Sequence, residues 1–182
     1  MFLQHLELAL RLTAAVPALD PATAFAHASA ALEARSEKVE PELLLAMAYI
    51  ESRYDPTSLS RVEGETRRTG PWRPRVPPKQ MNRSKSIFCG PLQTYARSWK
   101  QCLQQRQLDV AYPTAVAELE HWLRDRRVRG RISRALAGYG CGNHGVTTGK
   151  CNRYPERVLR MKEKITVGGG RTRGTKRTLP GS

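Results

Sequence analysis

Glu51 ends the most apolar segment of the sequence, residues 42–51, where it directly follows Tyr49 and Ile50. A carboxyl group in such surroundings loses hydration, which disfavours its charged form and raises its pKa. A carboxylic acid that keeps its proton near neutral pH can serve as a general acid. The same position also fits an ordinary helix-end carboxylate that faces solvent or pairs with Arg53. Glu51 is therefore a candidate catalytic acid with a plain structural alternative.

The sequence encodes no second carboxyl group beside Glu51. Asp55 follows four residues later, but Pro56 disfavours a helical conformation at Asp55, so the two side chains are not expected to share a helix face. This argues against the pair of a retaining glycosidase, whose two carboxyl groups lie about 5–5.5 Å apart. Among the acids after residue 60, we expect only Glu63 and Glu65 to be able to approach Glu51.

Positive charge is concentrated after the first third of the chain. The 182 residues contain 31 Lys and Arg against 16 Asp and Glu, a net charge of +15. Residues 1–60 hold 4 of the basic and 8 of the acidic side chains, and the cations gather in residues 67–85, 124–134 and 171–177. This distribution favours an acidic partner such as nucleic acid, teichoic acid, lipopolysaccharide or an acidic glycan. A solvated surface that maintains solubility is the alternative.

The length indicates one domain, and no run approaches the roughly 18–20 apolar residues of a membrane-spanning helix. The N-terminal segment is interrupted by polar and charged residues and lacks the pattern of a secretory signal peptide.

Four cysteines, at positions 89, 102, 141 and 151, suit two disulfides in an oxidising compartment. The pairs nearest in sequence are Cys89–Cys102 and Cys141–Cys151, although the sequence does not fix the connectivity. Free thiols are an alternative, and so is a zinc site of Cys141, His144 and Cys151, which lacks the usual C-x-x-C spacing. No metal or other cofactor is expected.

Helical periodicity dominates and predicts an all-α protein without strands. Residues 138–149 are predicted to be a loop, residues 61–88 a long irregular basic insertion, and residues 167–182 a flexible basic tail. The predicted helices cover residues 2–16, 21–35, 41–51, 91–107, 113–130, 132–139 and 154–165.

Four short motifs resemble those of the lytic transglycosylases with the goose-type lysozyme-like fold. Residues 48–56, Ala-Tyr-Ile-Glu-Ser-Arg-Tyr-Asp-Pro, resemble the helix end whose Glu-Ser pair holds the family's catalytic acid. Residues 90–93, Gly-Pro-Leu-Gln, are similar to the family's Gly-Leu-Met-Gln turn. Residues 137–140, Ala-Gly-Tyr-Gly, resemble its Ala-Tyr-Asn motif with Gly140 in place of the asparagine, and residues 154–159 resemble its tyrosine-led final helix.

The resemblance implies cleavage of the β-1,4 bond between N-acetylmuramic acid and N-acetylglucosamine in the glycan strands of peptidoglycan. Glu51 would protonate the leaving oxygen and then take the proton of the muramoyl C6 hydroxyl, which gives a 1,6-anhydro product without water. Gln93 and Tyr154 would line the sugar-binding cleft, and Ser52 and Tyr139 would contact the sugar or orient Glu51. Asn143 would stand in for the missing asparagine.

The resemblance also implies a division of the chain. Residues 41–166 would form a lysozyme-like helical domain, and residues 1–40 a helical extension that packs on it. Among the tryptophans, Trp72 is the best candidate for stacking on a sugar ring, whereas Trp99 and Trp122 are expected in the core. The basic insertion and tail would hold a monomeric enzyme on anionic envelope polymers, an interaction that salt weakens.

Two other functions stay open at this stage. One is a hydrolytic lysozyme of the same fold, in which water replaces the C6 hydroxyl. The other is a non-catalytic basic protein that binds nucleic acid or anionic cell-wall polymers. The expected location is the periplasm or cell envelope. Because the segment does not resemble a signal peptide, we expect the protein to reach this location by another route. A phage endolysin released by a pore-forming protein would have such a route, and so would a virion-associated or secretion-associated enzyme.

Overall fold

The computed structural model describes residues 1–61 and 87–168. This part of the chain is mostly helical, as predicted, and none of its helices is long and apolar enough to cross a bilayer. Its helices are α1 (Phe2–Ala15), α2 (Pro21–Ala34), α3 (Pro41–Ser52), α5 (Trp99–Gln104), α6 (Leu108–Arg124), α7 (Ile132–Thr148) and α8 (Tyr154–Thr166). Contrary to the prediction of a strand-free protein, it also contains the strands β1 (Leu59–Arg61), β2 (Ile87–Cys89) and β3 (Thr94–Ala96).

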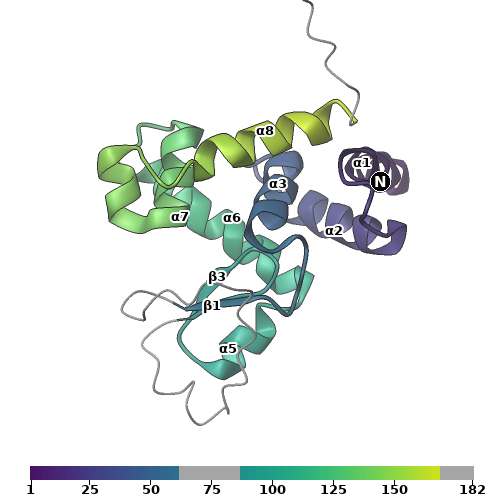
Figure 1. Ribbon diagram of the computed structural model, residues 1–182, viewed down its shortest axis with the longest axis horizontal. Coiled ribbons are helices and arrows are strands. Elements are labelled where there is room, and N and C mark those ends of the chain that lie inside the picture. Colours follow the sequence, from purple (N-terminus) through teal and green to yellow (C-terminus); the bar gives the residue numbers. More distant parts are fainter. Residues whose placement is uncertain (62–86, 169–182) are drawn as a thin grey trace, which may run out of the picture.

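Helix α3 lies at the centre of the molecule, in contact with α2, α6 and α8 (Figure 1). Its residues 43–48 are all buried, which confirms that a helix apolar on every side belongs in the core. Pro41 occupies the first turn, where its missing N–H costs no hydrogen bond. The central packing of α3 fixes the position of its last turn, which carries Glu51.

Helix α6 begins at Leu108, five residues before Pro113, and not at the proline as predicted. Tyr112, directly before the proline, is fully buried, and its hydroxyl lies 2.8 Å from the Nδ1 atom of buried His27 on α2. Because a proline inside a helix costs about 3 kcal/mol, we attribute the longer helix to tertiary packing of this kind and not to local propensity. Burial also lowers the pKa of His27 to about 4.

Helix α7 continues to Thr148 and so covers almost all of residues 138–149, which were predicted to be a loop because of their glycines. Only Gly142 leaves the helical conformation, where φ 57° and ψ −145° produce a kink. At Gly138 an added Cβ would lie 2.7 Å from the Trp122 ring, and at Gly145 it would lie 1.9 Å from the Ala137 carbonyl oxygen. Both glycines therefore permit close packing and do not mark a loop.

Residues 91–107, which were predicted to form one helix, also differ from the prediction. They contain a turn, strand β3 and the short helix α5. Strand β2 pairs antiparallel with β1 on one side and β3 on the other. The sheet and α5 enclose a small core of Ile87, Cys89, Ala96 and Cys102, against which Trp99 packs as expected of a core residue.

Two disulfides are present, Cys89–Cys102 and Cys141–Cys151, and no cysteine is free. The disulfide hypothesis is therefore confirmed with the pairs nearest in sequence, and the zinc alternative is wrong because two of its three ligands are bonded to each other. One bridge joins β2 to α5. The other joins Cys141 of α7, directly before the Gly142 kink, to Cys151 in the connection between α7 and α8.

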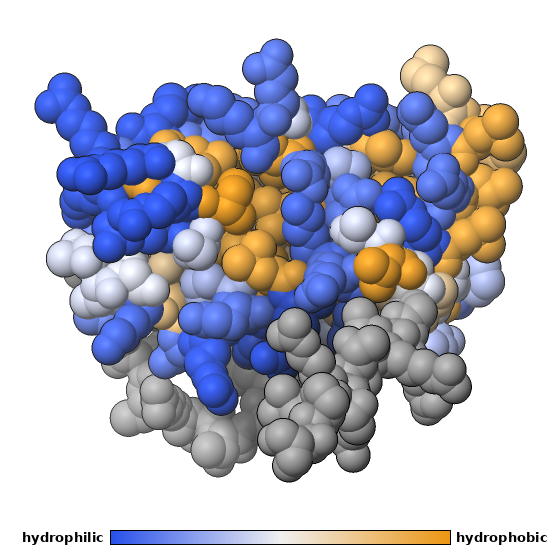
Figure 2. Space-filling model, turned by 90° about the horizontal axis from the view of Figure 1, so that it is seen from above, coloured by the Kyte–Doolittle hydropathy of each residue, from blue (hydrophilic) through white to orange (hydrophobic). Residues whose placement is uncertain are grey.

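Residues 1–40 form α1 and α2, which pack against each other and against the rest of the helices. Leu8 and Leu12 of α1 are buried, whereas its other face exposes Phe2, Leu3 and Leu10. Apolar side chains gather at the end of the molecule where α1 lies, and hydrophilic side chains cover most of the remaining face in that view (Figure 2). On α2, Asp20 caps the helix by accepting a hydrogen bond of 2.9 Å from the Thr23 N–H.

Candidate functional site

Glu51 lies in the last turn of α3 and is partly buried. The helix stops after Ser52 because Arg53 and Tyr54 adopt left-handed backbone conformations, with φ 61° and 68°. The Arg53 guanidinium stacks 3.9 Å above the centre of the Tyr49 ring. Arg53 therefore packs on its own helix, and the pairing of Glu51 with Arg53 that the sequence allowed is not found.

The turn at residues 90–93 is fastened to the end of α3 and to α7. The Ser52 hydroxyl donates to the Pro91 carbonyl over 2.9 Å, and the Tyr139 hydroxyl donates to the Leu92 carbonyl over 2.6 Å. The Gln93 side-chain amide closes the turn by donating to the Gly90 carbonyl over 2.8 Å. Ser52, Gln93 and Tyr139, predicted as site residues, thus meet in one hydrogen-bonded assembly beside Glu51.

Only glycine fits at the start of this turn. Gly90 has φ +76°, and an added Cβ would lie 1.9 Å from the Gln105 carbonyl oxygen. Its N–H donates to the Ser58 carbonyl over 3.0 Å, and the same carbonyl accepts a second hydrogen bond of 3.1 Å from the Gln93 amide. The backbone of the turn is therefore held by the Ser58 carbonyl, in the segment that follows α3, and leaves no space for a side chain at position 90.

The environment of Glu51 favours its neutral form. The pKa of its carboxyl group is raised to about 7, chiefly by burial and also by the negative charge of Glu118 on α6. The Tyr154 hydroxyl and the Arg157 guanidinium, both on α8, act in the opposite direction. The expectation that Glu51 would hold its proton near neutral pH therefore agrees with its surroundings.

Glu118 is the residue that the sequence analysis missed. Burial raises the pKa of this carboxyl to about 7 as well, opposed by the Trp122 indole four residues later on α6. The signal was present, because Glu118 comes three residues after Ala115 and four before Trp122, on the face predicted to be apolar. The two distant acids named instead, Glu63 and Glu65, lie outside the described residues.

Two buried hydrogen-bond donors adjoin the two carboxyl groups. The Tyr154 hydroxyl lowers the pKa of Glu51, and the Trp122 indole N–H lowers that of Glu118. Among the described residues, however, neither donor completes a hydrogen bond of good geometry. Tyr154 is only 8% exposed, and the proximity of Glu51 raises the pKa of its phenol still further above the usual value. Such donors can complete their hydrogen bonds when a carboxyl ionises or a ligand enters.

The structure explains why position 140 carries no asparagine. An added Cβ at Gly140 would lie 2.9 Å from the Cys151 sulfur and 3.0 Å from the Tyr154 ring. Asn143, the expected substitute, follows Tyr139 by four residues and comes directly after the Gly142 kink. It is exposed and accepts a hydrogen bond of 2.9 Å from the Arg127 guanidinium, before the start of α7. Arg127 in turn pairs with Asp125. Trp72 lies outside the described residues.

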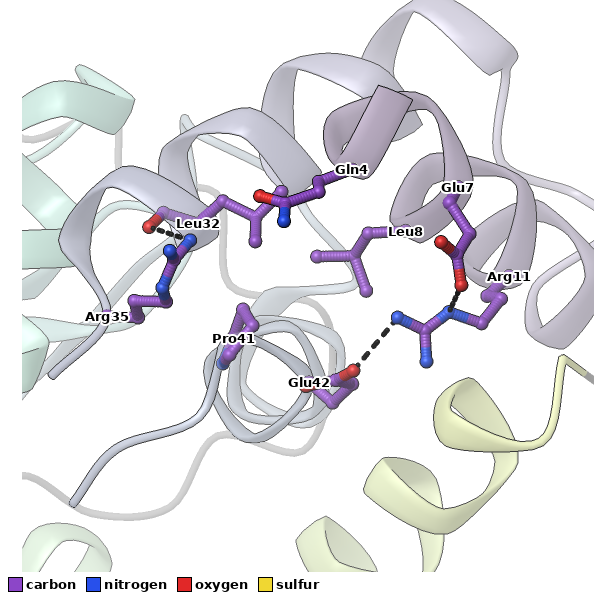
Figure 3. A pocket seen from close by; sticks show the side chains of 8 residues that line it. All are labelled: Gln4, Glu7, Leu8, Arg11, Leu32, Arg35, Pro41 and Glu42. Carbon is purple, nitrogen blue, oxygen red and sulfur yellow. Dashed lines mark hydrogen bonds and ion pairs between the residues drawn. The ribbon is translucent and has the colours of Figure 1, made fainter. Parts of the chain in front are cut away.

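A separate cavity of about 300 Å³ lies between α1, α2 and the start of α3 (Figure 3). Three of its charged groups are paired, because the Arg11 guanidinium lies 3.0 Å from the Glu42 carboxylate and 3.9 Å from that of Glu7. The fourth, Arg35, donates a hydrogen bond of 3.0 Å to the Leu32 carbonyl. Glu42 and Glu51 stand near opposite ends of α3, about 13 Å apart along the helix axis. This cavity therefore belongs to the junction of the N-terminal helices and not to the site around Glu51.

Within residues 1–61 and 87–168, no group of three or more His, Cys, Asp or Glu side chains is arranged to hold a metal ion. The chemistry available at the site is that of two carboxyl groups with raised pKa values, two adjoining donors and a rigid turn.

Comparison of the chain with protein-family models, curated proteins and solved structures finds no match.

Proposed function

We propose that this chain is a lytic transglycosylase with a lysozyme-like fold, which cleaves the β-1,4 bond between N-acetylmuramic acid and N-acetylglucosamine in peptidoglycan. The observation that carries the proposal is the environment of Glu51, whose pKa of about 7 lets it both donate and accept a proton near neutral pH. The four motifs that resemble those of the family also support the proposal. Ser52, Gln93, Tyr139 and Tyr154 all lie in contact with Glu51 or with the turn beside it.

The proposed reaction needs one carboxyl group to act twice. Glu51 first gives its proton to the glycosidic oxygen of the leaving N-acetylglucosamine as the bond from that oxygen to the muramoyl C1 breaks. The Glu51 carboxylate then accepts the proton of the C6 hydroxyl as the C6 oxygen bonds to C1. The acid is regenerated, no water is consumed, and the product carries a 1,6-anhydro ring. Tyr154 and Arg157 stabilise the carboxylate between the two steps.

Hydrolysis is the second candidate, and Glu118 is the observation that favours it. A second carboxyl group close to the acid could activate a water molecule, which would attack C1 in place of the C6 hydroxyl. The product would then be a reducing N-acetylmuramic acid end. The chemical form of the released ends therefore separates the two reactions.

Two features of the chain suit a substrate in the cell envelope. The disulfides are typical of proteins in oxidising compartments. The arginines at positions 124, 126, 127, 129 and 131 are exposed beside the α6–α7 connection, where they can attract anionic envelope polymers. A phage endolysin or a virion-associated or secretion-associated wall-degrading enzyme fits both features.

The test is mass spectrometry of the fragments that the full chain, with its disulfides intact, releases from purified peptidoglycan. We expect 1,6-anhydro ends from the wild type and a loss of about 10²–10⁴-fold in Glu51→Gln, since the amide cannot transfer the proton. Glu42→Gln, at the other end of the same helix, should cleave normally. Circular dichroism verifies that the variants fold.

The other outcomes each select a different function. Reducing ends that disappear in Glu51→Gln would make the protein a lysozyme. A folded wild type that sediments with peptidoglycan, or with nucleic acid, and releases nothing would contradict the enzyme proposal and leave a non-catalytic basic binding protein.

A further inference from the structure

Helix α1 presents an apolar stripe to solvent at the outer edge of the molecule (Figures 1 and 2). Phe2, Leu3, Leu6 and Leu10 fall on one face of the helix at about 3.6 residues per turn. Their side chains are 67%, 77%, 39% and 61% exposed. The Phe2 ring lies 6.0 Å from that of Phe25 on α2, which extends the patch. A surface helix normally exposes its polar face, so an apolar stripe on the solvent side indicates an interaction surface.

A strongly cationic part of the sequence begins beside the same helix. The Arg11 guanidinium, one residue after Leu10, donates to the Thr166 carbonyl at the end of α8 over 3.5 Å. Gly168 also lies against the Arg11 side chain, where an added Cβ would be 3.7 Å from Cγ. Residues 169–182 follow directly, and their sequence contains four Lys or Arg and no Asp or Glu. Apolar surface and uncompensated positive charge therefore adjoin at α1.

The occupant that fits both features is a bilayer surface with anionic headgroups. Apolar side chains of a surface helix enter the boundary between headgroups and acyl chains, while neighbouring cations attract the anionic headgroups. A second copy of this chain suits the patch less well. A symmetric dimer brings the same surface of both copies together, so the cationic segments of two chains with a net charge of +15 each would meet and repel.

We infer that the α1 face docks this protein on an anionic lipid surface, with the cations of residues 169–182 adding electrostatic attraction. The inference does not depend on the reaction proposed at Glu51. It does set an orientation, because α1 lies beside the start of α3, where Arg11 pairs with Glu42, whereas Glu51 lies in the last turn of α3. The candidate site is therefore at the end of α3 that lies farther from the lipid.

The test is co-sedimentation of the full oxidised chain with vesicles made of equal parts phosphatidylcholine and phosphatidylglycerol. We expect the wild type to bind these vesicles and to bind phosphatidylcholine alone much more weakly. Leu3→Gln/Leu10→Gln removes apolar surface without touching the core and should lower the partition constant by about tenfold or more. Leu103→Gln on α5, where the leucine is 42% exposed, is the matched control and should bind like the wild type. Circular dichroism verifies that the variants fold.

A second pair of variants tests the electrostatic part. Arg171→Gln/Arg173→Gln should weaken binding to the anionic vesicles by about fivefold or more. Arg126→Gln/Arg129→Gln removes the same charge from the exposed α6–α7 connection and should have a smaller effect. A larger loss in the second pair would mean that the lipid binds at that connection, which would overturn the inference.

Three further outcomes would also overturn it. One is a wild type that binds neither kind of vesicle, and another is undiminished binding by Leu3→Gln/Leu10→Gln. The third is a wild-type dimer in sedimentation equilibrium without lipid that this double variant dissociates, which would make a second copy the occupant. Vesicle binding is measured without peptidoglycan, so a protein that binds lipid but cleaves no glycan contradicts only the proposed function.

Discussion

The helical body and the sheet region of this protein are held together by different means. In the helical body, made by α1–α3 and α6–α8, one continuous core of buried side chains joins all six helices. In the described part of the sheet region, the apolar core between β1–β3 and α5 has only four buried residues, and two of these are the bonded cysteines Cys89 and Cys102. The smaller region has too little apolar surface to hold itself together by burial alone, so a covalent bond takes over part of that task.

The candidate site lies where these two regions meet. Glu51, Glu118, Tyr139 and Tyr154 belong to the helical body, whereas the turn at residues 90–93 belongs to the sheet region. The acid thus sits on the part whose position is fixed by packing, and the turn is bound to it by the hydrogen bonds from Ser52 and Tyr139. Changes to the two regions should therefore have different effects on global stability and on the site.

The largest effect is expected from a cavity in the helical body. Leu44 of α3 is completely buried, and Leu44→Ala should lower the free energy of unfolding by about 2–5 kcal/mol, the usual cost of a buried leucine truncation. Leu103→Ala on α5, where the leucine is 42% exposed, is the matched control and should cost far less. Urea unfolding followed by circular dichroism measures both. Equal losses would contradict the idea that α3 carries the core.

Removal of the Cys89–Cys102 bridge tests the other half of the comparison. Its ends are 13 residues apart, and loss of a loop of that length should cost about 3 kcal/mol. In Cys89→Ser/Cys102→Ser we expect amide hydrogen exchange to accelerate in β2, β3 and α5 while α3 stays protected. Cys141→Ser/Cys151→Ser should instead accelerate exchange near the α7–α8 junction. Uniform acceleration over the whole chain in the first variant would show that the two regions unfold as one.

A smaller effect, of opposite sign, is expected at the site itself. Burial raises the pKa of Glu51 from 4.5 to about 7, so the folded state binds more protons than the unfolded state between these values. Stability is therefore lost as the pH rises through this window. Glu51→Gln should stabilise the protein by about 1–3 kcal/mol at pH 8 and by nothing near pH 4.

Thermal unfolding at the two pH values measures this difference. Exposed Glu33 on α2 provides the control, since Glu33→Gln should produce no comparable gain at pH 8. A Glu51→Gln variant that is no more stable than the wild type at pH 8 would mean that the ionised carboxyl is well solvated in the folded protein.

The sequence predicted best where one physical effect dominates. The apolar run before Glu51 can only be satisfied in a core, so α3 and its last turn were predicted correctly. Glycines allow two opposite interpretations, because they form loops and also permit close helix contacts. At Gly138 and Gly145 the tertiary packing decides between these, and the local sequence contains no information about the Trp122 ring or the Ala137 carbonyl.

The strands and Glu118 were missed for related reasons. Each strand has only three residues, too few for an alternating pattern to stand out, and their pairing depends on residues 59–61 meeting residues 87–89 across a long insertion. Glu118 lies on the face of its helix predicted to be apolar, a signal of partial burial that its charged type concealed. The groups that surround it depend on how α6 packs against α3 and α7, which a single sequence does not specify.

Buried His27 has a practical consequence for the study of this site. Because its pKa is lowered to about 4, the folded state gains stability relative to the unfolded state as the pH rises from 4 to 6.5. The raised carboxyls produce the opposite slope from 4.5 to 7, so His27 offsets one of the two across the shared window. The other carboxyl leaves a net loss of about 1.4 kcal/mol of folding free energy per pH unit in this window, so the fold is more stable at the acidic end. Rate losses in mildly acidic buffers therefore report proton transfer at the site and not loss of the fold.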